Sequence, residues 1–242
     1  MKSKKKVFLK NNKELIVLFV FIFLIGVLFG LKFGMFNKMI NLTGEKSISI
    51  YAPAINDKGE GVLINLTTSV RSGRGLVLVN INNVLADFEL QKSSREATKA
   101  AADYLGLKLN NIDLVYAIKS DADIIGGGSA GAAMALSAIS VLGDIKLKDD
   151  IMITGIINES GDIGKIGGVK EKIKASKGKA SVFLLPIGQS SEIKNYKSKM
   201  ECKMINKIEY CKTNYVEAEM EFEGIKVIEV KNLEEALRYF RK

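Results

Sequence analysis

Ser129 is a residue whose type and setting could support chemistry, because three glycines precede it and a run of small apolar residues, 130–142, follows it. Glycines allow tight turns with positive φ, and the following run is predicted to form a buried helix. The serine would therefore lie at a helix start, beside backbone N–H groups that have no helical partner. Such a site stabilises negative charge, either on a bound phosphate or on the oxyanion of a tetrahedral intermediate. For an isolated GGGS segment, however, a simple N-cap serine is the favoured interpretation.

The choice of acid–base groups is limited, because the 242-residue chain contains no histidine. This excludes Ser–His–Asp and Cys–His catalytic sites and zinc sites built on histidine. The two cysteines cannot form a zinc or iron–sulfur site by themselves. We therefore expect no metal and no other cofactor, and any proton transfer must use Lys, Asp, Glu, Tyr or Cys.

A second segment, residues 154–172, reads TGIINESGDIGKIGGVKEK and changes the interpretation of Ser129. Together the two segments resemble the proteolytic domain of the Lon protease family, whose motifs are D-G-P-S-A-G, M-T-G-x-I and G-G-x-K-E-K. The corresponding residues here are GGGSAG at 126–131, ITGII at 153–157 and GGVKEK at 167–172. The resemblance covers roughly residues 46–240 and is strongest with archaeal, membrane-attached Lon-like proteins that lack an ATPase. These share segments similar to YAPA at 51–54 and LLPIGQ at 184–189.

The resemblance implies an α+β, Lon-type proteolytic domain that acts as a serine endopeptidase on unfolded or flexible polypeptide segments. The family's catalytic lysine corresponds to Lys172, which follows Ser129 by 43 residues as in the family, so the resemblance implies a Ser129–Lys172 dyad. Thr154 corresponds to a threonine that supports the lysine, and it is expected to hydrogen-bond to Lys172. The backbone around Gly127, Gly128 and Ser129, at the helix start, is expected to hold the oxyanion. The resemblance also implies a homo-oligomeric ring.

The proposed base sets a physical requirement on its surroundings. A serine hydroxyl needs a base, and a lysine can be that base only if burial lowers its pKa enough to leave it neutral. A helix that begins at Val169 would place Lys172 on an inward face and Lys170 in solvent.

The sequence departs from the family motif at two positions, since Gly126 replaces a frequent Asp and Gly128 replaces Pro. The acidic group is missing from its usual position, although Asp121 and Asp123 lie just upstream. Two other functions stay open. A phosphate-binding or small-molecule kinase-like module would use the glycine–serine turn but would leave the GGVKEK motif unexplained. A catalytically inactive scaffold would keep the fold, yet both dyad residues are present. No G-x-x-x-x-G-K-[ST] motif occurs, so we expect activity without an ATPase module in this chain.

The elements that must position these motifs can be predicted from hydrophobic periodicity and from the places of glycine and proline. The predicted helices are 92–105, 130–142, 169–177 and 233–241. The predicted strands are 47–54, 61–70, 75–81, 112–118, 150–158, 163–166, 181–185 and 225–230. The strands 61–70 and 75–81 are expected to form a hairpin through the turn RSGR. Because strands lead and helices interleave later, the fold class is α+β with mixed β-sheets.

The N-terminal 44 residues carry most of the net charge of +9, since they hold eight lysines and one glutamate. The remainder is nearly neutral, which argues against a nucleic-acid partner. Residues 15–31 are uncharged, and with Lys32 extending its ammonium toward the surface the segment 15–36 could cross a hydrocarbon layer of about 30 Å. We therefore expect one N-terminal transmembrane helix, with the lipid bilayer as its partner.

The expected topology is a single-pass signal anchor in the cell membrane. Six lysines precede the apolar run and two closely follow it, which places the N-terminus in the cytoplasm and the domain outside. A cleaved signal peptide is the rival interpretation, but no A-x-A site follows the run. The expected organisation is a basic cytoplasmic tail (1–14), an anchor (15–36), a linker (37–45) and the protease domain (46–242). In an oxidising exterior, Cys202 and Cys211 could form a disulfide.

Overall fold

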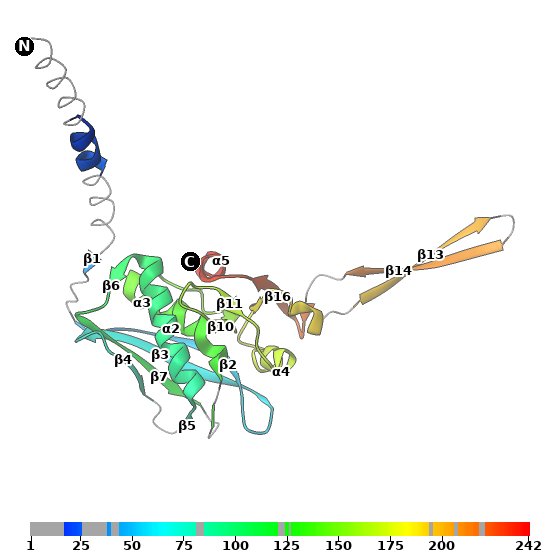
Figure 1. The fold of residues 1–242 in the computed structure, drawn as a ribbon. Coiled ribbons are helices and arrows are strands. Elements are labelled where there is room, and N and C mark those ends of the chain that lie inside the picture. The colour runs from blue at the N-terminus through cyan, green and yellow to red at the C-terminus, as the bar shows by residue number, and fades with distance from the viewer. Residues whose placement is uncertain are drawn as a thin grey trace, which may run out of the picture.

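The computed structural model describes residues 17–25, 38–39, 44–80, 85–120, 124–125, 127–193, 196–205, 208–217 and 221–242. Its domain combines helices with two four-stranded sheets and several two-stranded sheets (Figure 1). The helices of the domain are α2 (Phe88–Leu105), α3 (Gly131–Gly143), α4 (Val169–Ala175) and α5 (Leu233–Phe240), and the 3₁₀ turns are η1 (Gly128–Ala130) and η2 (Ser190–Glu192). The predicted α+β class with mixed sheets is confirmed.

The first sheet is mainly antiparallel and forms one side of the domain. Its strands in spatial order are β2 (Lys46–Ile55), β3 (Gly61–Ser72), β7 (Ile112–Lys119) and β4 (Val77–Asn80). β2, β3 and β7 pair antiparallel, whereas β4 runs parallel to β7. The sheet is therefore mixed.

The predicted hairpin between β3 and β4 is wrong, because β7 lies between these two strands. The connecting turn is bound to the start of β7, where the carboxylate of Asp113 accepts hydrogen bonds from the backbone N–H of Arg74 (2.8 Å) and of Leu76 (2.9 Å). These hydrogen bonds also hold the pKa of Asp113 below its usual range. The turn thus carries the chain across the end of β7 to its far side, a long-range effect that local patterning does not reveal.

The second sheet is mainly parallel, with the order β15 (Glu221–Phe222), β16 (Ile225–Val230), β12 (Val182–Pro186) and β9 (Ile151–Ile153). Only β15 of this sheet is antiparallel to its neighbour. The predicted strand 150–158 is interrupted at Thr154 and Gly155, so that its end forms β10 (Ile156–Ile157), which pairs with β11 (Ile163–Gly164). Two short parallel pairs complete the described strands of the body, β1 (Lys38–Met39) with β6 (Leu107–Lys108) and β5 (Leu85–Ala86) with β8 (Ile124–Ile125).

The helix α3 is the centre of the core, since its residues from Gly131 to Val141 are buried on every side. α2 packs on α3, and both helices cover the same face of the first sheet (Figure 1). The buried hydroxyls of Thr68 in β3 and Ser137 in α3 share a hydrogen bond of 2.7 Å. Packing on all sides therefore fixes α3, and with it the turn η1 that contains Ser129.

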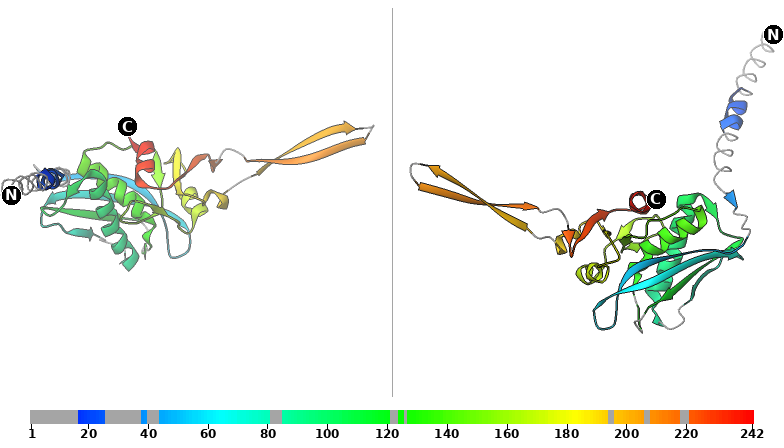
Figure 2. Two further views of the ribbon diagram at one scale, coloured as in Figure 1. Left: turned by 45° about the horizontal axis from the view of Figure 1, so that its top comes forward. Right: turned by 180° about the vertical axis from the view of Figure 1, so that it is seen from behind.

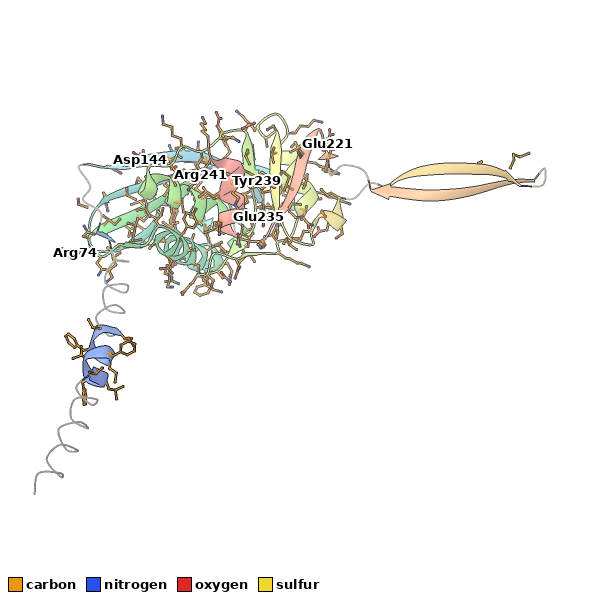
Figure 3. The ribbon with its side chains drawn as sticks, turned by 90° about the horizontal axis from the view of Figure 1, so that it is seen from above. Arg74, Asp144, Glu221, Glu235, Tyr239 and Arg241 are labelled. Carbon is orange, nitrogen blue, oxygen red and sulfur yellow. The ribbon has the colours of Figure 1, made fainter. Side chains whose placement is uncertain are left out.

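The C-terminal helix α5 lies on the body of the domain, whereas the hairpin of β13 (Tyr196–Ile205) and β14 (Ile208–Glu217) projects away from it (Figures 2 and 3). Cys202 and Cys211 are directly opposite in the register of this hairpin. Cys202 is disulfide-bonded.

The described part of the predicted membrane anchor is the segment 17–25, which is helical with exposed side chains. The other residues of the anchor, 15–16 and 26–36, lie outside the described residues, as does the basic tail 1–14. Among the helices of the described ranges, none is both long enough and apolar enough to span a bilayer.

Candidate active site

Lys172 is buried in the described structure, with 3% of its surface exposed, on the inner side of α4. Lys170 is exposed on the same helix, as expected for residues about 200° apart around a helix axis. The predicted register of α4 is therefore confirmed. Burial lowers the pKa of the Lys172 ammonium to about 8, because a low-polarity environment disfavours the charged form.

The start of α4 depends on Gly168, whose φ of +67° is in the left-handed region. A Cβ at this position would also lie 2.8 Å from Cδ1 of Ile55, a strand residue of β2. Glycine thus permits both the turn into α4 and the close approach of α4 to the first sheet.

Ser129 is half-buried in η1, directly before α3. Its backbone carbonyl accepts two hydrogen bonds, from the N–H of Gly155 (2.9 Å) and from the hydroxyl of Thr154 (3.2 Å). The carbonyl of Gly155 in turn accepts from the N–H of Ala132 (3.0 Å). The interruption between β9 and β10 therefore serves to hold the serine-bearing turn.

Thr154 is fully buried, but its hydrogen bond differs from the sequence-based prediction. Its hydroxyl donates to the backbone of Ser129, whereas the sequence led us to expect a hydrogen bond to Lys172. The reason is the break in the strand: Thr154 follows the last residue of β9 and faces η1.

Ser129 and Lys172 line the same open cavity, which has a volume of about 540 Å³. Ser129 and Lys172 are 43 residues apart in sequence, yet both border this one cavity. Its other lining residues are mainly glycines and isoleucines: Ile55, Gly59, Gly127, Gly128, Ile156, Ile166, Gly167 and Gly168. An extended polypeptide backbone could approach closely over the glycine walls, and the isoleucines offer apolar contacts.

Gly127 was expected to help hold the oxyanion, but its N–H is already bound to another group. Its φ is +85°, as the glycine turn requires, but its N–H donates to a side chain, Oδ2 of Asp87, at 2.7 Å. The backbone N–H groups of Gly128 and Ser129 are thus the better candidates for holding an oxyanion. Asp121 and Asp123 lie outside the described residues.

Three side chains that bind the cavity's backbone were missed by sequence reasoning: Asp87, Ser93 and Gln189. Ser93 donates to the carbonyl of Gly128 at 3.0 Å. The buried amide of Gln189 both accepts from the N–H of Ile166 (2.8 Å) and donates to its carbonyl (2.7 Å). Asp87 could have been recognised as an N-cap at the true start of α2, while the other contacts join residues far apart in sequence.

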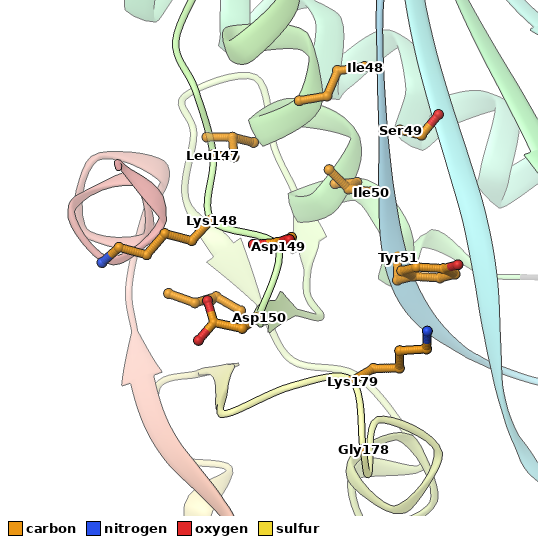
Figure 4. A pocket seen from close by; sticks show the side chains of 11 residues that line it. Ile48, Ser49, Ile50, Tyr51, Leu147, Lys148, Asp149, Asp150, Gly178 and Lys179 are labelled. Carbon is orange, nitrogen blue, oxygen red and sulfur yellow. The ribbon is translucent and has the colours of Figure 1, made fainter.

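A second cavity, of about 470 Å³, lies beside β2 and contains none of the predicted catalytic or supporting residues (Figure 4). Lys179 points toward the ring of Tyr51 there, with its Nζ 5.2 Å from the ring centroid, and Asp149 and Asp150 line the opposite side. In the part of the chain that the structure describes, no group of three or more acidic, cysteine or histidine residues could hold a metal ion.

Comparison with known proteins identifies the family. Residues 89–217, more than half of the chain, match the Lon protease (S16) C-terminal proteolytic domain. The archaeal Lon protease of Methanocaldococcus jannaschii is 37% identical over 109 residues, which cover 43% of this chain and 17% of that protein. Lon protease 1 of Syntrophobacter fumaroxidans is 31% identical over 147 residues, 58% of this chain and 18% of that protein. Lon protease of Helicobacter pylori is 29% identical over 164 residues, 65% of this chain and 19% of that protein. The chain thus spans less than a fifth of the length of these relatives, and it belongs to the Lon protease proteolytic-domain family.

Proposed function

We propose that this chain is a serine endopeptidase in which Ser129 is the nucleophile and Lys172 is the general base. Its substrates would be unfolded or flexible polypeptide segments, cleaved without an ATPase module in this sequence. The observation that carries the proposal is the shared cavity, which is lined both by Ser129 and by a buried lysine with a lowered pKa. Membership of the Lon protease family supports the same activity.

The pKa of Lys172 makes the base role quantitatively reasonable. With a pKa of about 8, about a tenth of the Lys172 side chains are neutral at pH 7. An ordinary lysine, with a pKa of 10.5, would be neutral in only about one molecule in 3,000. Burial therefore raises the population of the reactive form by a factor of several hundred.

In the proposed reaction, Oγ of Ser129 attacks the carbonyl carbon of the substrate while Nζ of Lys172 accepts the hydroxyl proton. The carbonyl electron pair moves to its oxygen, which the N–H groups of Gly128 and Ser129 stabilise. The lysine then returns the proton to the leaving amine, and water hydrolyses the acyl-serine ester by the same steps. Thr154 would act on the position of Ser129 through its backbone rather than on Lys172.

The test is covalent labelling of the full-length chain with a fluorophosphonate probe, followed by mass mapping of the modified residue. We expect labelling at Ser129 and cleavage of an unfolded protein substrate, both abolished in Ser129→Ala and Lys172→Ala. Lys170→Ala is the matched control, since this lysine is on the same helix but exposed. Labelling at another residue, or equal activity of all four proteins, would exclude this site.

The two alternative functions predict different results for the same variants, with phosphate transfer from ATP as a second assay. A phosphate-binding or kinase-like module would transfer phosphate from ATP and would keep that activity in Ser129→Ala and Lys172→Ala. An inactive scaffold would neither be labelled at Ser129 nor cleave an unfolded protein.

We also propose the membrane topology expected from the sequence: a cytoplasmic tail 1–14, an anchor 15–36, a linker 37–45 and a protease domain 46–242 outside the cytoplasm. The lysine asymmetry around the apolar run supports this orientation. Protease added to intact cells should digest the domain, and protection until lysis would reverse the orientation. A homo-oligomeric ring, the remaining expectation, would be detected by light scattering of the detergent-solubilised chain.

A further inference from the structure

The first turn of α2 is bound directly to the glycine turn that precedes Ser129. Asp87 is the N-cap of α2, and its two carboxylate oxygens have separate partners. Oδ1 accepts from the N–H of Leu90 at 2.9 Å, and Oδ2 accepts from the N–H of Gly127 at 2.7 Å. One carboxylate therefore joins the helix start to the turn with two charge-assisted hydrogen bonds.

Ser93 binds the same turn one peptide further along. Its side chain is buried, with 2% exposed, and its hydroxyl donates to the carbonyl of Gly128 at 3.0 Å. In a trans peptide the C=O and the following N–H point in opposite directions. The Gly128 carbonyl also accepts from the N–H of Gly131 at the end of η1. Because the Gly128 carbonyl is directed toward Ser93 and Gly131, the N–H of Ser129 points the opposite way. Ser129 lines the cavity, whereas Ser93 is not among its lining residues.

We propose that Asp87 and Ser93 are positioning residues that hold the turn of residues 127–129 so that the N–H groups of Gly128 and Ser129 face the oxyanion of the substrate. The inference rests on the proposed function of Ser129 as a nucleophile. Two features give these contacts a role. Gly127 has no side chain and a φ of +85°, so this residue adds little conformational restriction where the chain enters η1, whereas the Ser129 carbonyl further along is held by Gly155 and Thr154. Position 126 also carries glycine, and the acid that binds the turn is Asp87, the N-cap of α2.

Asp87→Asn separates positioning from helix capping. Asparagine is as good an N-cap as aspartate, so its oxygen can still accept from the N–H of Leu90. Its second group is an NH₂ donor, which cannot accept from the N–H of Gly127. Ser93→Ala removes the other contact. Glu89→Gln is the matched control, because Glu89 is an exposed acid in the same first turn of α2.

The experiment measures three quantities in the full-length chain: the rate of fluorophosphonate labelling at Ser129, and the affinities of a peptide aldehyde and of the corresponding peptide alcohol. The aldehyde adds Oγ of Ser129 to its carbonyl carbon, the carbonyl electron pair becomes an oxyanion, and the hydroxyl proton passes to Lys172. The alcohol binds without an oxyanion. In Asp87→Asn and Ser93→Ala we expect labelling and kcat to fall about 10- to 100-fold, as for a misplaced catalytic group.

The aldehyde affinity should fall by the same factor as labelling, while KM and the alcohol affinity stay at the wild-type values. Hydrogen exchange of the 127–129 amides should become faster in both variants, and Glu89→Gln should match the wild type throughout. Equal loss of aldehyde and alcohol affinity, or wild-type labelling in both variants, overturns the positioning role alone. A wild-type chain that is not labelled at Ser129 overturns the proposed function, and the positioning role with it.

Discussion

Replacing Lys172 by methionine should stabilise the folded chain at neutral pH, because the wild-type protein holds a mostly protonated ammonium in a buried position. Methionine has a similar length and no charge, so it can fill the same space without the cost of burying charge. The size of the effect follows from the pKa. A fall from 10.5 to about 8 corresponds to about 3 kcal/mol of unfavourable free energy for the protonated form.

The stability gain should depend on pH in a defined direction. The unfolded chain keeps the Lys172 proton up to about pH 10.5, whereas the folded chain releases it near pH 8. Between these values the unfolded state binds more protons, so the stability of the wild type rises with pH. The advantage of Lys172→Met is therefore full, about 3 kcal/mol, at about pH 6 and falls by about 2 kcal/mol by about pH 9.5.

Urea unfolding of the full-length wild type and variant at several pH values measures this difference directly. Lys170→Met is the control, because Lys170 is exposed on the same helix and its replacement should leave the pH dependence unchanged. The variant should also lose all peptidase activity, so that stability and activity change in opposite directions. A constant difference between wild type and Lys172→Met from about pH 6 to 9.5 would refute a buried, titrating lysine.

Three further measurements test the site and its surroundings. The rate of peptide hydrolysis by the wild type should rise about tenfold per pH unit below about pH 8 and level off above it, since only neutral Lys172 accepts a proton. A flat pH–rate profile would contradict the base role. Thr154→Val removes the hydroxyl that donates to the Ser129 carbonyl. We expect kcat to fall about tenfold and the free energy of unfolding in urea to fall by about 1 kcal/mol. Unchanged values would show that this hydrogen bond does not position Ser129. Gly131→Ala would place a Cβ against the Ser93 hydroxyl and 2.8 Å from Cγ2 of Ile157. The free energy of unfolding in urea should therefore fall by about 1–3 kcal/mol. A wild-type unfolding midpoint would mean that α3 can shift to accept the methyl group.

The parts of the fold that were predictable from sequence are those fixed by local pattern. The helix 130–142 is apolar on every face and is the buried α3, and the strand 225–230 matches β16. The period of a helix that begins at Val169 placed Lys172 inside and Lys170 outside, as observed. In each case the residue pattern of one helix or strand is enough to predict its burial or its bounds.

The parts that were not predictable depend on contacts between distant segments. β3 and β4 look like a hairpin, but Asp113 binds the intervening turn and β7 pairs with both strands. The start of α2 was placed four residues too late, because Phe88 is apolar but 67% exposed and thus breaks the expected pattern. The hydrogen bond of Thr154 was assigned to the wrong partner because the break after β9 depends on how η1 packs there.

The position of Asp87 bears on the proposed role of Lys172 as a base. Burial lowers the pKa of Lys172, and a carboxylate in contact with it would oppose that effect by favouring the ammonium. Glycine at 126 and 128 leaves the serine-bearing turn without a charge of its own. The acid that does bind the turn, Asp87, has its carboxylate oxygens hydrogen-bonded to the N–H groups of Leu90 and Gly127. The turn can therefore be held by a charged group while its charge is directed to the backbone of α2 and the turn, rather than to the lysine.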